Sequence, residues 1–146
     1  MAKTKKIDVE ALTLQMDQVV RSLKQLVAKH IEHGGLDITA DQWILLKLVA
    51  TNSGLTQKQL AQAAGKDKPT VTRMLELMIK KDWVVKEPTP GDRRSYLILP
   101  TKSGQEAYRL GREHADKAMK QIWKKVGTKE KKATQKTIVK LLEQLS

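Results

Sequence analysis

The sequence has no cysteine and no phenylalanine among its 146 residues, and aromatic residues make up only 3% of it. Without cysteine, the chain can form no disulfide, no thiolate metal site and no cysteine redox switch. Without phenylalanine, the core must be aliphatic, and an apolar aromatic ligand pocket is disfavoured. No stretch approaches the roughly 20 apolar residues that span a bilayer, so we expect no membrane partner.

Signatures of enzymes and of export are also missing. There is no nucleophile elbow, phosphate-binding loop or dinucleotide fingerprint, and the basic start of the chain is not followed by an apolar run. His30 and His33 lie three apart, a spacing that can share a metal, but with His114 they form no recognisable acid–base or ligand set. We therefore expect a cytoplasmic protein that is not an enzyme and holds no cofactor or metal.

Positive charge is abundant, with a formal net charge of +12. Residues 53–104 carry 10 Lys/Arg against 5 Asp/Glu, and residues 105–146 carry 11 against 5. A small basic domain usually meets a polyanion such as nucleic acid, because the electrostatic attraction is large and independent of sequence. Excess lysine can also serve solubility alone, so charge by itself does not settle the function.

Hydrophobic spacing and capping residues predict four helices in the first part of the chain. The first covers about residues 9–33, with apolar residues three and four apart, and ends at Gly34 and Gly35. Two capping boxes, Thr39 with Gln42 and Thr56 with Gln59, open the next two. The second helix ends at Asn52-Ser53-Gly54 and the third at Gly65; Pro69 then fits the first turn of a fourth helix that runs to about Lys81.

The remaining chain predicts a β-hairpin followed by two more helices. Strand-like runs cover residues 83–85 and 96–99, separated by the turn-rich loop KEPTPGDRRS. Ser103 and Glu106 form a third capping box, which predicts a long basic helix to about Val126. Gly127 breaks that helix and Thr128 is expected to cap the last one, which carries an apolar stripe at Ile138, Leu141, Leu142 and Leu145.

This order predicts a mainly α protein with a small β-hairpin wing, that is, a winged helix-turn-helix core. In such a core the second helix of the pair enters the major groove of DNA, where base edges are distinguishable. The hairpin tip reaches the backbone or the narrow, electronegative minor groove. The expected DNA-binding residues are those at the start of the second helix and at the hairpin tip: Lys66, Lys68, Pro69, Thr70, Thr72, Arg73, Arg93 and Arg94.

The segment from Asp41 to Gly104 resembles the MarR family of bacterial regulators. The resemblance rests on TADQWILLKLV, LTQKQLAQAAG, PTVTRMLELMIKKDWV and, most specifically, the wing DRRSYLILPTKSG. It implies one domain over 1–146, with a DNA-binding lobe at about 37–104 and dimerisation helices at about 8–33 and 103–146. It also implies an obligate homodimer on a pseudo-palindromic operator. Asp92 would hold a wing arginine in place while Arg93 or Arg94 enters the minor groove.

Three residues depart from the family pattern. Asp82 stands where glycine is common, and Trp83 and Pro100 stand where aliphatic residues are usual. Asp tolerates the left-handed backbone conformation better than most residues, so we expect Asp82 to do little damage.

The resemblance implies a transcriptional regulator, usually a repressor that occludes a promoter, with a small-molecule effector left open. Two alternatives remain at this stage. The first is a sequence-nonspecific architectural DNA-binding protein, which the lysine-rich C-terminal helices would favour. The second is a winged helix that binds only proteins, which the basic recognition face and the arginine-tipped wing argue against.

Overall fold

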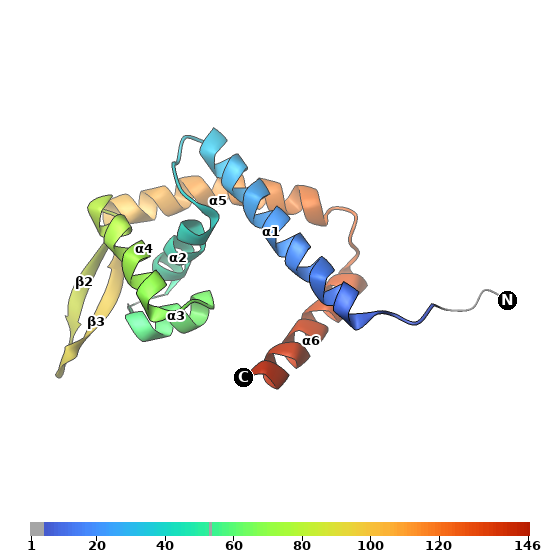
Figure 1. Ribbon diagram of the computed structural model, residues 1–146. Coiled ribbons are helices and arrows are strands. Elements are labelled where there is room, and N and C mark those ends of the chain that lie inside the picture. The colour runs from blue at the N-terminus through green and yellow to red at the C-terminus, as the bar shows by residue number, and fades with distance from the viewer. Residues whose placement is uncertain (1–4, 53) are drawn as a thin grey trace.

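Three long helices and a winged-helix unit make up the part of the chain that the structure, a computed structural model, describes: residues 5–52 and 54–146 (Figure 1). The elements follow in the order α1 (Val9–His33), α2 (Ala40–Thr51), β1 (Leu55–Thr56), α3 (Gln57–Ala64), α4 (Lys68–Lys80), β2 (Val84–Thr89), β3 (Asp92–Pro100), α5 (Lys102–Trp123) and α6 (Thr128–Leu145). The predicted fold class is confirmed, because the protein is mostly helical with one small antiparallel sheet.

Local capping signals place most of the helix ends where the sequence predicts them. Thr39 and Gln42 form the predicted capping box of α2. Thr56 and Gln59 do the same for α3. Gly65 ends α3 in the left-handed conformation, with φ of 65°, which costs glycine nothing because it lacks a Cβ. Ser53, expected in the turn after α2, lies outside the described residues.

Two predicted caps are wrong by one or two residues. The N-cap of α5 is Thr101, whose hydroxyl accepts a hydrogen bond from the Gly104 amide at 2.9 Å, so Ser103 lies inside the helix. The last helix begins after Gly127, whose amide donates to the Glu130 carboxylate at 3.2 Å. Thr128 is therefore the first helical residue and not the cap. Thr101 thus accepts from a free amide in the first turn of α5, whereas no side chain that the structure describes caps the first turn of α6.

The sheet is larger than the sequence predicts. Its order is β1-β3-β2, and the short strand β1, which the sequence analysis missed, pairs with β3 through Leu55 and Ile98. The hairpin strands run further toward the tip than expected, leaving only Pro90 and Gly91 between them. Pro88 fits within β2 because β2 is an edge strand, where a missing amide donor is tolerated.

The core lies under α2 and joins the winged-helix unit to α1 and α5. Its fully buried side chains come from α1, α2, α3, α4, β2 and β3: Ile31, Leu45, Leu46, Val49, Leu60, Val71, Leu75, Met78, Val84 and Ile98. Trp83 packs at the base of the wing, and its carbonyl accepts a hydrogen bond from the Thr101 amide. A Cβ on Gly104 would collide with that carbonyl oxygen, so only glycine permits this close approach.

Asp82 confirms the expectation made for it. Its φ is 60°, the one positive value at a non-glycine residue among residues 5–52 and 54–146. Asp82 thus takes the left-handed conformation that ends α4, the role expected of the glycine in the family pattern.

The long helices leave much apolar surface uncovered. No residue of α6 is buried within the protomer, and Leu142 and Leu145 are 61% and 82% exposed. Figure 1 shows α6 projecting from the end of α5, far from the wing. Within residues 5–52 and 54–146, no helix is both long and apolar enough to cross a membrane.

Candidate nucleic-acid interface

The start of α4 presents free backbone amides to solvent. Asp67 occupies the N-cap position, but its side chain makes no capping hydrogen bond, and Lys68 and Pro69 open the helix. The first amides of a helix have no intrahelical partner, and the helix dipole adds partial positive charge there. An anion such as a phosphate is therefore favoured at this helix end.

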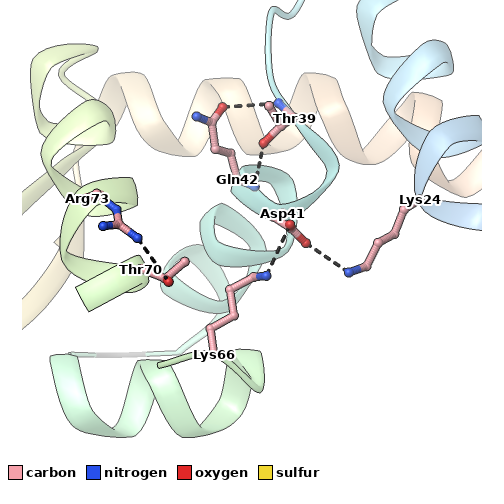
Figure 2. A network of polar contacts seen from close by, with 7 residues as sticks. All are labelled: Lys24, Thr39, Asp41, Gln42, Lys66, Thr70 and Arg73. Atoms are coloured by element: carbon pink, nitrogen blue, oxygen red, sulfur yellow. Dashed lines mark hydrogen bonds and ion pairs between the residues drawn. The ribbon is translucent and has the colours of Figure 1, made fainter. Parts of the chain in front are cut away.

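One face of α4 is buried and the other carries polar side chains. Val71, Leu75 and Met78 face the core, as the sequence predicts. On the outer side, Arg73 is exposed and its Nη2 lies 3.5 Å from the hydroxyl oxygen of Thr70 (Figure 2). These two side chains therefore lie together on the outer face, where a guanidinium and a hydroxyl can both donate to base edges or phosphates.

Thr72 points toward α3 and is already hydrogen-bonded. Its hydroxyl donates to the Lys68 carbonyl at 3.0 Å and accepts from the amide group of Gln57, the first residue of α3. Gln57, which the sequence analysis did not single out, thus ties the two helices of the pair together. Thr72 can therefore fix the angle between α3 and α4, in addition to its predicted role at the DNA interface.

Lys66, just before α4, is held by a carboxylate from α2. Its ammonium nitrogen lies 3.2 Å from Oδ2 of Asp41, and its side chain is only 22% exposed. Oδ1 of the same carboxylate lies 3.0 Å from the ammonium of Lys24 on α1 (Figure 2). Asp41 therefore connects the long helix α1 to the loop that leads into α4.

The pKa of Asp41 reflects this arrangement. Burial of the carboxyl acts to raise its pKa, but the hydrogen bonds and positive charges of Lys24 and Lys66 outweigh burial, so the pKa lies below its usual value. Neither Asp41 nor Lys24 was a predicted site residue. Asp41 lies 17 positions from Lys24 and 25 positions from Lys66, so no local pattern could have shown these contacts.

The hairpin tip is held by Asp92. Its Oδ1 accepts a hydrogen bond from the backbone amide of Arg94 at 2.9 Å, so Asp92 fixes the arginine through its main chain. Arg93 and Arg94 are both exposed. Successive residues of a strand point to opposite faces, so only one of the two can point toward a given groove.

A cavity of about 530 Å³ lies between α1, α2 and α5. Trp43 and Tyr108 form part of its wall, with ring centroids 5.5 Å apart and planes 17° from parallel. A tryptophan and a tyrosine thus form an aromatic wall without any phenylalanine. The charged residues that line the cavity are Lys24, Lys47, Arg112 and Asp116.

Two of the three histidines, His30 and His114, make contacts within the protein. The Nδ1 atom of His30 lies 3.0 Å from the Leu26 carbonyl oxygen, and the His114 ring packs against Gly34. Among residues 5–52 and 54–146, no three His, Cys, Asp or Glu side chains gather as a metal-binding group.

Comparisons with known proteins find similarity to the MarR family. Residues 36–95 match the family model described as the MarR family. The chain is 35% identical to the multiple antibiotic resistance protein MarR of Escherichia coli over 69 residues, which are 47% of this chain and 48% of that protein. It is 24% identical to an uncharacterised HTH-type transcriptional regulator, YybA, of Bacillus subtilis over 70% of this chain and 67% of that protein. The match to MarR thus spans about half of that relative.

Solved structures share the fold over nearly the whole chain. A mutant MarR from E. coli complexed with operator DNA has a TM-score of 0.82 and 23% identity, covering 92% of this chain and 95% of that one. NadR in complex with 4-hydroxyphenylacetate has a TM-score of 0.77 and 21% identity, covering 97% and 96%. At these identities the likeness establishes the fold alone.

Proposed function

We propose that the chain is a transcriptional regulator of the MarR family that binds operator DNA as a homodimer and represses transcription. The observation that carries this is the exposed basic face of α4 beside an arginine-tipped wing in one winged-helix unit. The structural likeness to a MarR that is bound to operator DNA supports it. In this role the protein is not an enzyme and works in the cytoplasm, where bacterial DNA is transcribed.

In the proposed complex, each predicted site residue has a role at the DNA interface. Arg73 and Thr70 contact base edges in the major groove, and Thr72 holds the helix pair while facing the same groove. Lys68 and Pro69 open α4, where the free N–H groups of the first turn meet a phosphate, although Pro69 itself has none to donate. Lys66 supplies a further positive charge nearby. Arg94, held by Asp92, enters the minor groove, while Arg93 on the other face of the strand meets the backbone.

Dimerisation accounts for the apolar surface that the protomer leaves uncovered. Ile138, Leu141, Leu142 and Leu145 lie on one side of α6 and are all exposed. On α1, Leu12, Val19 and Val20 are exposed as well. Exposed apolar helix surface of this kind marks an interaction site, and a second copy is the commonest partner. A two-fold dimer then presents two α4 helices, which matches a pseudo-palindromic operator.

The cavity between α1, α2 and α5 supports a small-molecule effector as part of the proposal. Stacked aromatic rings beside Lys24, Lys47 and Arg112 suit an aromatic ring that carries a negative charge. The relative NadR is seen in complex with such a molecule, 4-hydroxyphenylacetate. An occupant would press on the α1–α2 contact at Asp41 and so act on the loop before α4.

Selection of binding sites from randomised duplex DNA, followed by sequencing, tests the proposal. A pseudo-palindrome with half-sites about one helical turn apart is the expected result. Tight, steeply salt-dependent binding with no enriched sequence would instead support the architectural alternative.

A further inference from the structure

The end of α5 and most of α6 account for the greater part of the protein's net positive charge. Residues 117–140 contain nine lysines and a single acidic residue, Glu130, a formal net charge of +8 out of +12 for the whole chain. No arginine lies in this segment. The segment is separate from α4 and from the wing, and Figure 1 shows α6 at the other end of the molecule from the hairpin.

The lysines of this segment form no ion pair with any carboxylate that the structure describes. Ion pairs elsewhere, such as Arg21 with Asp17 and Arg112 with Asp116, neutralise part of the surface charge. Across residues 5–52 and 54–146, none of the nine lysines in residues 117–140 lies within ion-pair distance of a carboxylate. All nine are exposed, so their charges face water together.

On α6 the lysines follow the helical repeat. Four of them are spaced three, four and four residues apart, which places them within about a quarter of the helix circumference: Lys129, Lys132, Lys136 and Lys140. We call these four residues the C-terminal lysine stripe. The apolar residues proposed for dimerisation, Ile138, Leu141, Leu142 and Leu145, lie on the opposite side of the same helix. A partner that covers the apolar side therefore leaves the lysine stripe open.

We propose that the C-terminal lysine stripe is a second DNA-contacting surface, which binds the phosphate backbone independently of sequence and apart from α4 and the wing. This inference rests on the proposed function only because it takes DNA as the ligand. Its effect is to let one dimer hold a second duplex, or a distant part of the same DNA, while the winged helices occupy the operator.

The spacing and chemistry of the stripe fit a nucleic-acid backbone. From Lys129 to Lys140 the helix rises about 16 Å, a length over which one DNA strand presents about five phosphates. Lysine is a compact charge on a flexible stem, which suits phosphates at variable positions and gives no base discrimination. Four regularly spaced charges match a polymer of uniform negative charge.

Other polyanions fit less well. Protein–protein interfaces are depleted in lysine and enriched in arginine, whereas residues 117–140 have only lysine. A helix lying on an anionic membrane inserts its apolar side. Because the stripe lies opposite that side, inserting it would turn the four lysines away from the lipid headgroups.

The test compares two charge-matched variants of the full-length protein. The stripe variant is Lys129→Gln/Lys132→Gln/Lys136→Gln, and the control is Lys5→Gln/Lys6→Gln/Lys29→Gln, which removes the same charge from exposed positions outside the stripe. Binding to a long random-sequence duplex is followed by fluorescence anisotropy over a salt series. A third variant with arginine at the three stripe positions keeps the charge and checks that any loss is not misfolding.

We expect the stripe variant to bind the random duplex at least tenfold more weakly at low salt. The slope of log affinity against log salt should fall by about 0.9 for each phosphate that is no longer neutralised, up to about 3 per protomer. The control variant should change much less, and the arginine variant should behave as the wild type. The sequence selected from randomised DNA should be the same for all of them.

Equal losses of affinity in the stripe and control variants would overturn the inference. So would a stripe-dependent binding to phosphatidylserine vesicles with no effect on DNA. If the stripe variant binds DNA as the wild type does, and binding still depends on the wing, this inference is overturned and the proposed function stands. If binding depends on the stripe but no sequence is enriched from randomised DNA, the inference about the stripe is supported and the proposed operator recognition is overturned.

Discussion

The carboxylate of Asp41 on α2 lies 3.2 Å from the ammonium of Lys66, the lysine that stands two residues before α4. Lys24 of α1 binds the other oxygen of the same carboxylate at 3.0 Å. A single acidic side chain thus links the long helix that we propose for dimerisation with the start of the helix that we propose for DNA reading.

Asp41→Asn should lower stability only modestly at neutral pH. The Asp41 side chain is 41% exposed, so solvent screens both pairs and the loss in free energy of unfolding should stay below about 1 kcal/mol. The pKa of Asp41 is lowered in the folded protein, so its contribution is present above the unfolded value of about 3.9 and is lost as pH falls through the folded value. Urea unfolding of both proteins should therefore show a gap that closes below about pH 4. A gap that widens in acid would contradict this, and Asp17→Asn provides an exposed control.

Lys66→Gln should weaken DNA binding less than Lys68→Gln does. The Lys66 ammonium is already engaged by Asp41, whereas Lys68 is exposed at the start of α4 and meets no carboxylate among the described residues. Each variant removes one positive charge within the same short segment, so the pair is matched. Affinity for one operator duplex at fixed salt measures the difference. If Lys66→Gln costs as much as Lys68→Gln, Lys66 leaves Asp41 for a phosphate when DNA binds.

Operator binding by the wing should require a hydrogen-bond acceptor in the side chain at position 92. Asp92→Ala removes the oxygen that accepts from the Arg94 amide and should weaken operator binding, whereas Asp92→Asn keeps an acceptor and should behave nearly as the wild type. Arg94→Ala should cost most on operators with A·T-rich flanks, where the minor groove is narrow. Binding to duplexes with A·T-rich and G·C-rich flanks measures both. If removing Arg93 and Arg94 together leaves affinity intact, the wing does not touch DNA.

Leu142→Glu should break the dimer. Leu142 is 61% exposed in the protomer, and a dimer interface would have to bury the new charge without a partner. Gln144→Glu adds the same charge outside the apolar side of α6 and serves as the control. Sedimentation equilibrium should show the first variant as a monomer and the second as a dimer. If both variants are dimers, the interface lies elsewhere on the protein. A wild type that is a monomer at micromolar concentration would contradict the proposed dimer.

Helix ends were predictable from the sequence because capping is local. The boxes at Thr39 and Thr56 and the left-handed turn at Gly65 each depend on residues within three or four positions. The misplaced caps at Ser103 and Thr128 show the limit of such signals. When several polar residues adjoin a helix start, their sequence order does not say which of them satisfies the free amides.

Contacts between distant segments were not predictable. Strand β1 has two residues and exists because Leu55 and Thr56 pair with β3, more than 40 positions away. The Asp41 bridge joins residues from α1, α2 and the loop before α4. The cavity wall of Trp43 and Tyr108 joins α2 to α5. The predicted DNA-binding residues do lie at the start of α4 and at the wing tip, but the contacts that position Lys66 and Thr72 came only from the structure. For the wing, the family resemblance already implied that Asp92 holds an arginine, and the structure shows that it does so through the Arg94 backbone amide.

The measurement that tests the central claim most directly is the effect of Arg73→Ala on the selected operator and on random DNA. Arg73 is exposed on the outer face of α4, and a bidentate base contact there is worth about 1–3 kcal/mol. Lys80→Ala, which removes a charge from the far end of the same helix, is the matched control. A loss of that size on the operator, with little loss on random DNA, is the predicted result. Equal losses on both would make Arg73 a phosphate contact and contradict sequence reading by α4.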